Sequence, residues 1–330
     1  MLCAQVPVQH GLRLSEIHAH DPFILADKGT RTYYLYQSSG PRNAKDGHCG
    51  VIAYTSEDLE SWSGPYLVFE IPGGSWADPA EYLWAPEVHF YKGKYYLFAT
   101  LNNQKAPLVL ETLPPPSNTQ IDVSYAGHKG LHPRGTQVFV ADSPIGPFKT
   151  ILDAPIPPRD YTTLDGTFWV ENGTPYMVYA HEWLQVLDGQ MEAVAMKPDL
   201  SAAAGRPFFL FKASDAPWLD ERTETVNTPQ TYVTDGPELY RTRKGVLLML
   251  WSSYQNGSYV EAVARSTSGK LNGPWKQEGI LLGNDSGHGM IFHAFDGSLK
   301  FVVHHPFDGR KSRAYIYGIE DTGDGLRLEK

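Results

Sequence analysis

The sequence predicts an all-β protein with the architecture of a five-bladed β-propeller, in which each blade holds four antiparallel strands. Three observations carry this prediction. A hairpin pattern recurs five times along the chain, a second pattern of strand, turn and strand follows its copies, and apolar residues at helical spacing are nearly absent. A β-sandwich is the alternative, but it is not expected to repeat hairpins that begin with a polar head.

The recurring hairpin consists of a short polar head, a strand, a turn that contains glycine, and a second strand rich in Tyr, Val, Leu and Met. Its copies are DPFILADKGTRTYYLYQSS (21–39), APEVHFYKGKYYLFATL (85–101), DGTFWVENGTPYMVYAH (165–181), DGPELYRTRKGVLLMLWSS (235–253) and HGMIFHAFDGSLKFVVHH (288–305). Such a hairpin supplies the first two strands of each unit.

The second pattern supplies the other two strands. An apolar strand is followed by a turn with Ser or Asp, and Gly-Pro or its equivalent leads into the next strand. Its copies are VIAYTSEDLESWSGPYLVF (51–69), TQVFVADSPIGPFKTIL (136–152), EAVAMKPDLSAAAGRPFFLF (192–211), EAVARSTSGKLNGPWKQ (261–277) and, in altered form, RAYIYGIEDTGDGLRLEK (313–330). Residues 1–330 are therefore expected to form one domain, with residues 1–17 as an N-terminal arm.

The composition favours a carbohydrate partner. A formal net charge of -9, with no runs of Lys or Arg, argues against binding to nucleic acid or an anionic membrane surface. The aromatic content of 12%, with 19 Tyr and 8 Trp, exceeds what a core needs, and aromatic faces stack on sugar rings. Core packing still accounts for most of these side chains.

The sequence is compatible with more than one cellular compartment. No apolar stretch is long enough to span a bilayer, and residues 1–9 are too short for a signal peptide. The chain is expected to be cytoplasmic, or secreted or periplasmic if a signal has been removed. The two cysteines, Cys3 and Cys49, do not indicate a disulfide framework.

The heads of the hairpins are the candidate catalytic residues. In a propeller the innermost strands converge on a central channel, so their first residues meet at one end of it. The expected heads are Asp21, Ala85, Asp165, Asp235 and His288. An Asp before Pro or Gly can simply cap a turn, but crowded carboxylates perturb one another's pKa, which is typical of acid/base sites.

The segments HDPFIL, LWAPEVHFYKGKYYLF, LDGTFWVENGTPYMVY, TDGPELYR and GHGMIF, in this order, resemble glycoside hydrolase family 43 from about His20 to His305. The resemblance implies an inverting propeller enzyme that needs no cofactor for its chemistry and acts on pentose-containing plant oligosaccharides or polysaccharides. It implies that Asp21 is the general base and that Asp165 tunes the pKa of the acid and orients it.

The general acid has three candidates. The family usually places Glu immediately before Gly-Pro in the fourth blade, where this chain has Asp235. Glu238 follows three residues later, but strand alternation would turn its side chain to the other face. Glu182 ends the strand beside Asp165 and is expected to be exposed at the rim of the pocket.

The resemblance also implies other contacts. Trp84 and Trp183 are candidate walls for stacking on sugar rings, and His20 and Glu87 are candidates for bonding hydroxyl groups. A structural Ca²⁺ or Na⁺ on the axis would use His288; the alternative is a histidine hydrogen-bonded among the heads.

The favoured activity is α-L-arabinofuranosidase, with arabinanase, β-xylosidase or galactanase as alternatives within the family. A propeller phosphorylase would need a basic cluster for phosphate, to which His18, His20, His288 and Arg134 could contribute. A non-catalytic carbohydrate-binding propeller is the third possibility. The long segment Asn102 to Pro133 is expected to wall one side of the cleft.

Overall fold

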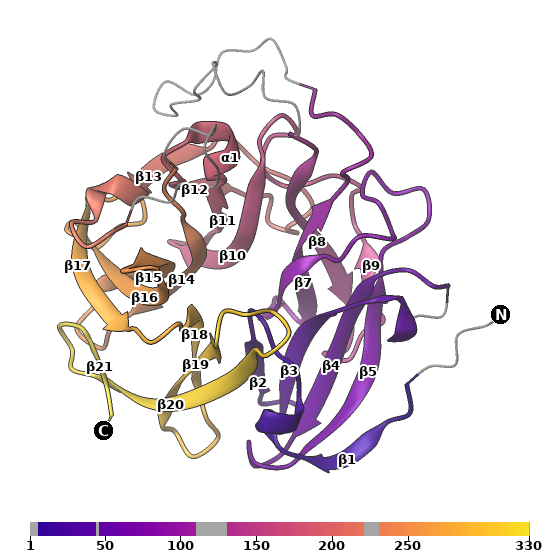
Figure 1. The fold of residues 1–330 in the computed structure, drawn as a ribbon. Helices are drawn as coiled ribbons and strands as arrows, with labels where there is room; N and C mark the ends of the chain where they lie inside the picture. The colour runs from indigo at the N-terminus through magenta and orange to yellow at the C-terminus, as the bar shows by residue number, and fades with distance from the viewer. Residues whose placement is uncertain (1–5, 44–45, 110–130, 221–230, 330) are drawn as a thin grey trace.

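The computed structural model describes residues 6–43, 46–109, 131–220 and 231–329. These residues form five antiparallel sheets arranged around a central axis (Figure 1). The prediction of a five-bladed propeller with four strands in each blade is confirmed. None of the helices in these ranges is long and apolar enough to cross a membrane.

Each blade runs outward from the axis in chain order. Blade 1 contains β2 (Phe23–Asp27), β3 (Thr32–Ser39), β4 (Gly50–Ser56) and β5 (Trp62–Glu70). Blade 2 contains β6 (Trp84–Tyr91), β7 (Lys94–Asn102), β8 (Arg134–Ala141) and β9 (Lys149–Thr150). Blade 3 contains β10 (Thr163–Glu171), β11 (Thr174–His181), β12 (Gln190–Ala195) and β13 (Phe208–Lys212).

The last two blades have the same order. Blade 4 contains β14 (Asp235–Arg241), β15 (Leu247–Gln255), β16 (Ser258–Ser266) and β17 (Trp275–Leu282). Blade 5 contains β18 (Gly287–His293), β19 (Leu299–His305), β20 (Arg313–Asp321) and β21 (Leu326–Leu328). Helical elements are single turns: η1 (Leu14–Glu16), η2 (Pro41–Asn43), α1 (Trp183–Val186) and η3 (Ala213–Asp215).

Part of the expected N-terminal arm is structured. Strand β1 (Gln9–Leu12) pairs with the outer edge of β5, so blade 1 has a fifth strand. This pairing supplies partners for an edge that would otherwise expose backbone N–H and C=O groups.

The cores lie between neighbouring sheets. Second strands such as β3, β7, β15 and β19 carry runs of buried apolar residues, because their two faces pack against adjacent blades. The largest fully buried side chains include Trp62, Trp251 and Phe139. This packing holds the five inner strands around the axis.

A bulge at the start of the inner strand sets the position of each head. In blades 2 to 5 the pairing of the first two strands shifts register near its start, after the first residue pair in blades 2, 4 and 5 and after the second in blade 3. The residue inside the shift has a positive φ: 42° at Ala85, 56° at Asp165, 51° at Gly236 and 49° at His288. Asp21 has the same conformation, with φ 52°. Bulges of this kind redirect a side chain.

The bulges correct one predicted equivalence. The fourth-blade residue that matches the heads Asp21, Asp165 and His288 is Gly236, not Asp235. Asp235 pairs with Ser252 just as Trp84 pairs with Thr100, so Asp235 occupies the position before the head. The one-residue difference places the Asp235 carboxyl group beside the heads instead of among them.

Candidate active site

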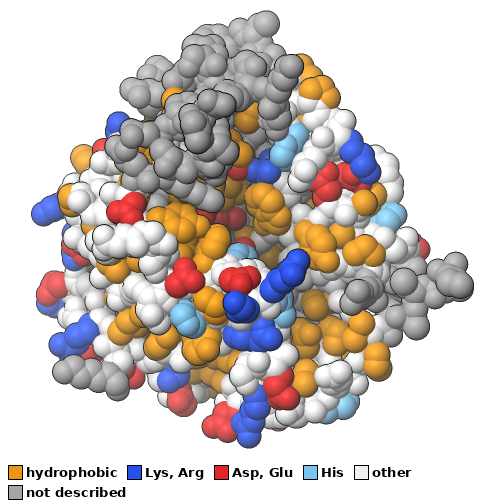
Figure 2. All heavy atoms as spheres, viewed as in Figure 1, with side chains coloured by type: hydrophobic (Ala, Val, Ile, Leu, Met, Phe, Trp, Pro, Cys, Tyr) orange, Lys and Arg blue, Asp and Glu red, His pale blue; other side chains and the backbone are white. Residues whose placement is uncertain are grey.

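Two carboxylates and an imidazole meet where the inner strands begin. His288 Nδ1 lies 3.1 Å from Oδ1 of Asp21 and 3.7 Å from Oδ2 of Asp165. The three residues head blades 5, 1 and 3, so the propeller brings together side chains that are far apart in the sequence. In the space-filling view, acidic side chains and histidine gather at the centre of this face, among hydrophobic ones (Figure 2).

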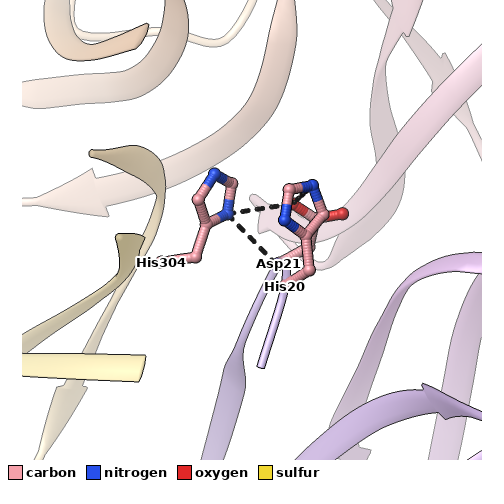
Figure 3. A group of neighbouring side chains, drawn as sticks. All are labelled: His20, Asp21 and His304. Carbon is pink, nitrogen blue, oxygen red and sulfur yellow. Dashed lines mark hydrogen bonds and ion pairs between the residues drawn. The ribbon is translucent and has the colours of Figure 1, made fainter. Parts of the chain in front are cut away.

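Asp21 is surrounded by histidines. His304 Nδ1 lies 3.2 Å from its Oδ1, and His20 Nε2 lies 3.6 Å from the same atom (Figure 3). Burial alone would raise the pKa of Asp21, but the charges of His20 and His288 and a hydrogen bond from His288 outweigh it. The pKa therefore lies well below its usual value of 3.8, and Asp21 is a carboxylate at neutral pH.

Two of the three histidines beside Asp21, His288 and His304, differ in charge. Burial lowers the pKa of His288, but the charges of Asp21 and Asp165 raise it well above 6.5, so this imidazole is protonated at neutral pH. Burial dominates at His304 and lowers its pKa to about 4, although the charge of Asp21 opposes the shift. One cation therefore sits between Asp21 and Asp165.

Asp165 is held by the neighbouring blade 4. Its Oδ2 accepts a hydrogen bond of 3.1 Å from the backbone N–H of Gly236. Burial raises the pKa of Asp165 to about 7; the charge of Asp21 adds to this effect, and the charge of His288 opposes it. Glycine is required at the donor because a Cβ at residue 236 would lie 2.9 Å from the His288 ring.

Asp235 is the half-buried carboxyl group beside this trio. Burial and the neighbouring charge of Asp165 raise its pKa well above 3.8, while His288 opposes the shift. The hydroxyl of Tyr259 donates to its Oδ2 at 3.1 Å. There is therefore a pH range in which Asp235 is protonated while Asp21 is ionised.

Side chains at the ends of second strands hold the heads. Thr100 Oγ1 accepts from the backbone N–H of Asp165 at 2.9 Å, and Ser252 Oγ accepts from that of His288 at 2.8 Å. His304 Nδ1 accepts from the backbone N–H of Asp21 at 3.2 Å. Each acceptor pairs with the residue that precedes the head of its own blade, and it bonds the head of the next blade around the axis.

Blade 3 has no such side-chain acceptor on its second strand, and this explains why the N–H of Gly236 bonds Asp165 instead. The position that matches Thr100 and Ser252 is Ala180, which pairs with Leu164 and has no side-chain acceptor. The Asp165 carboxylate takes the N–H of Gly236 instead. Sequence reasoning did not identify these supporting residues; a Thr, Ser or His after an apolar run in blades 2, 4 and 5 was the available signal.

A second buried carboxyl group supports His288 from behind. Glu261 is fully buried, and its Oε2 accepts from Ser252 Oγ at 2.8 Å and from the backbone N–H of Gly289 at 2.9 Å. Burial raises its pKa to about 8, although both hydrogen bonds oppose the shift. Sequence reasoning missed Glu261 because nothing in EAVARS marks it.

Glu182 does not have the expected exposed position. Its side chain is 4% exposed, and its Oε1 forms an ion pair with Nη1 of Arg134. Arg134 also donates from Nε to Oδ1 of Asn102 at 2.6 Å and lies over the Trp84 ring, 4.3 Å from its centroid. The prediction of a rim carboxylate is wrong, because a long-range pair with Arg134 buries it.

Glu238 and Glu87 lie along the axis. Both line a cavity of about 10 Å³ together with Asp21 and His288, which is room for about one water. Glu87 is buried and pairs with His89 at 2.8 Å, so it does not face a sugar-sized space. Burial and the charge of Glu87 raise the pKa of Glu238 well above 4.5.

The described residues do not fit the expected axial ion. Ca²⁺ takes about six to eight oxygen ligands, whereas the axial cavity has room for one water and His288 turns Nδ1 toward two carboxylates. His20, Asp21 and His304 offer ligand atoms within 4.8 Å of one another. Their imidazole rings are stacked, 4.2 Å apart, so the in-plane lone pairs do not converge on one ion.

The two tryptophans predicted to stack on sugar rings lie in different environments. Trp84 is half-buried beside the heads, with Arg134 on its ring. Trp183 is 8% exposed and belongs to the core between blades 3 and 4, so the prediction that it stacks on sugar is wrong. His20 is half-buried, with Nδ1 3.0 Å from Ser312 Oγ and Nε2 toward Asp21.

In the part of the chain that the structure describes, the four residues suggested as a phosphate-binding cluster do not come together. Arg134 is paired with Glu182, His288 with Asp21 and Asp165, and His18 is exposed with Nε2 against Gly309 O. Of the segment Asn102 to Pro133, residues 110–130 lie outside the described residues.

The chain matches one protein family over most of its length. The family model described as "Glycosyl hydrolases family 43" matches residues 14–322. An endo-arabinase from Bacteroides thetaiotaomicron is 33% identical, covers 94% of this chain and 98% of its own, and superposes with a TM-score of 0.78.

Two further solved structures share the fold at lower identity. A thermostable family-43 glycoside hydrolase is 20% identical over 99% of this chain and 94% of its own, with a TM-score of 0.69. An endo-1,4-β-xylanase from Bacteroides thetaiotaomicron is 20% identical over 97% of each chain, with a TM-score of 0.67. The match over nearly the whole propeller places this chain in glycoside hydrolase family 43, and the protein is a glycoside hydrolase.

Proposed function

We propose that this hydrolase cleaves α-L-arabinofuranosyl linkages with inversion, using Asp21 as general base and Asp235 as general acid. The assignment is supported by their different surroundings: histidines contact Asp21, whereas Asp235 is half-buried beside Asp165, so the two pKa values shift in opposite directions. Two carboxyl groups whose environments drive their pKa values apart are what acid/base catalysis of glycoside cleavage needs.

In the proposed reaction Asp21 accepts a proton from a water that attacks the anomeric carbon. Asp235 gives its proton to the glycosidic oxygen as the bond to the anomeric carbon breaks, so the water's oxygen ends on the sugar and the leaving group departs as an alcohol. Asp165 assists because its negative charge raises the pKa of Asp235. The positive charge of His288 stabilises the carboxylates of Asp21 and Asp165 during the proton transfers.

The choice of sugar is supported by a relative. The 33% identity to an endo-arabinase supports arabinan as the substrate and internal cleavage as the mode. The sequence-based expectation of an α-L-arabinofuranosidase, which left exo and endo action open, is the alternative, and that activity cuts the same type of bond. A xylan- or galactan-directed enzyme would use the same carboxylates on a different ring.

The test is hydrolysis of linear 1,5-α-arabinan beside nitrophenyl α-L-arabinofuranoside, xylan and galactan. Endo action on arabinan gives a ladder of oligosaccharides early in the reaction, whereas exo action gives arabinose alone. Proton NMR of the first product reports its anomeric configuration. Asp21→Asn is the inactive control, and failure to act on any arabinofuranosyl bond contradicts the proposed substrate.

Two other functions have direct tests. A phosphorylase would release sugar phosphate and would depend on inorganic phosphate, whereas a hydrolase turns over in phosphate-free buffer. A non-catalytic binder would retain arabinan without releasing reducing ends. The ionised Asp21 and protonated Asp235 favour hydrolysis over both.

A further inference from the structure

Three aromatic rings stack between the proposed base and the proposed acid. The rings of His20 and His304 lie with centroids 4.2 Å apart and planes 17° from parallel. Tyr259 stacks on His304 at 5.4 Å and 9°. The three residues come from blades 1, 5 and 4, and the proposed reaction gives Tyr259 no role so far.

The His304–Tyr259 pair has a polar contact at each end. His304 Nδ1 lies 3.2 Å from Oδ1 of Asp21. The Tyr259 hydroxyl donates to Oδ2 of Asp235 at 3.1 Å. The two stacked rings therefore connect the proposed base to the proposed acid without a chain of hydrogen bonds between them.

The Tyr259 ring is confined. It is 1% exposed, and Phe307 packs on it with centroids 4.6 Å apart. On the blade 5 side, a Cβ at Gly287 would lie 2.5 Å from Cε1 of Tyr259, so backbone closely approaches the ring edge. The hydroxyl is therefore held at one place relative to β14.

We propose that Tyr259 is a positioning residue, which fixes the carboxyl group of Asp235 and, through its stack on His304, the placement of that group relative to Asp21. The inference rests on the proposed role of Asp235 as general acid. Asp is one methylene shorter than the Glu usual at this position, so a fixed carboxyl orientation matters more for reaching the glycosidic oxygen.

The hydrogen bond also affects the proton transfer itself. Because the hydroxyl of Tyr259 donates to Oδ2, the proton that Asp235 transfers resides on Oδ1. Once that proton has left, the bond from Tyr259 becomes charge-assisted and stronger. Tyr259 therefore stabilises the ionised acid formed in the reaction more than the protonated acid that precedes it.

The test is Tyr259→Phe, which removes the hydroxyl and keeps the ring. We expect kcat/KM to fall about tenfold to a hundredfold for aryl arabinofuranosides with poor leaving groups and much less for good ones. The basic limb of the pH profile should move up by about one pH unit, because the ionised Asp235 loses a donor. The other groups that face Asp235 are unchanged by this substitution: Asp21, Asp165 and His288.

Tyr240→Phe is the matched control. It removes a hydroxyl that donates to Oδ2 of Asp321 at 3.0 Å, near the end of β14 opposite to Asp235. This variant should leave both the leaving-group dependence and the pH profile unchanged. If Tyr259→Phe has an unmoved basic limb, or equal losses for good and poor leaving groups, the positioning role is overturned.

A double variant separates this inference from the proposed function. In the Asp235→Asn background, Tyr259→Phe should cause no further loss on poor leaving groups, because the acid it positions is absent. A further loss of the full size would overturn the role of Tyr259 alone. Full activity of Asp235→Asn on poor leaving groups would overturn the assignment of the acid.

Discussion

The Nδ1 atom of His288 lies 3.1 Å from Oδ1 of Asp21. The contact pairs a protonated imidazole with an ionised carboxylate at the start of two neighbouring inner strands. Because His288 also lies 3.7 Å from Asp165, its charge lowers the pKa of both carboxyl groups. The same charge lowers the pKa of Asp235. One imidazole thus biases every carboxyl group of the proposed mechanism toward ionisation.

His288→Asn should therefore move the whole pH profile of kcat/KM to higher pH. The acidic limb follows ionisation of Asp21 and the basic limb follows loss of the proton from Asp235, and removing the cation raises both pKa values. The expected displacement is about one pH unit for each limb. Limbs that move in opposite directions would contradict this account.

Asp165→Asn should move only the basic limb, and downward. Burial and the charge of Asp165 raise the pKa of Asp235. Without that charge Asp235 loses its proton at lower pH, by about one pH unit. Activity at neutral pH should fall accordingly. Asp153→Asn, which removes an exposed carboxylate that bonds Ser75 and Trp76, should leave the profile unchanged.

The propeller could be predicted because its signals are local. Alternating apolar residues and glycine turns mark each hairpin wherever it lies in the chain. The order of the blades then brings Asp21, Asp165 and His288 to one place, and the structure does bring their side chains into contact.

What the sequence did not reveal depends on register and on long-range contacts. The bulge at Gly236 shifts the fourth head by one residue, and a shift of that size turns a side chain to another face. Glu182 is buried by Arg134, 48 residues earlier, and no local pattern encodes that ion pair. Trp183 belongs to the core because a single helical turn, α1, follows β11 and turns it inward.

Glu182→Gln should behave as a structural substitution. Breaking a buried ion pair costs about 3 to 5 kcal/mol of unfolding free energy, whereas Asp142→Asn, at the exposed pair with Lys94, should leave the unfolding free energy nearly unchanged. Chemical denaturation measures both. Any loss of activity in Glu182→Gln should be equal for good and poor leaving groups; a selective loss with poor ones would identify Glu182 as the acid.

Glu261 should be replaceable by Gln but not by Ala. Its Oε2 accepts from Ser252 and Gly289, and an amide oxygen can accept the same two bonds. Glu261→Ala leaves both donors without a partner and creates a cavity behind His288, with an expected cost of about 2 to 5 kcal/mol. Glu261→Gln should retain most of the stability and of kcat/KM at pH 7, because burial raises the pKa of Glu261 to about 8 and it is largely neutral there.

The same pair of variants also tests the direction of pH dependence. The folded pKa of Glu261 lies above its ordinary value of 4.5, so folding favours the protonated form. Through this group, the unfolding free energy of the wild type should decrease as pH rises from about 4.5 and should level off above about 8. Glu261→Gln removes that contribution, so the difference in stability between variant and wild type should change in favour of the variant at high pH.

Gly236→Ala should disrupt the site through a steric contact. Gly236 has φ 51°, and a Cβ there would lie 2.9 Å from Cγ and Cδ2 of His288. The imidazole cannot retreat without giving up its contacts with Asp21 and Asp165. Crowding of this kind costs about 1 to 3 kcal/mol, in addition to the strain of a positive φ.

Gly173→Ala separates the two contributions. Gly173 has φ 80°, but a Cβ there would meet nothing within 4 Å, so this variant carries the backbone strain alone. Gly236→Ala should unfold at lower denaturant concentration than Gly173→Ala and should lose at least tenfold in kcat/KM, while Gly173→Ala keeps its activity. Equal stability of the two variants, with activity retained in both, would show that His288 does not need the space that Gly236 leaves.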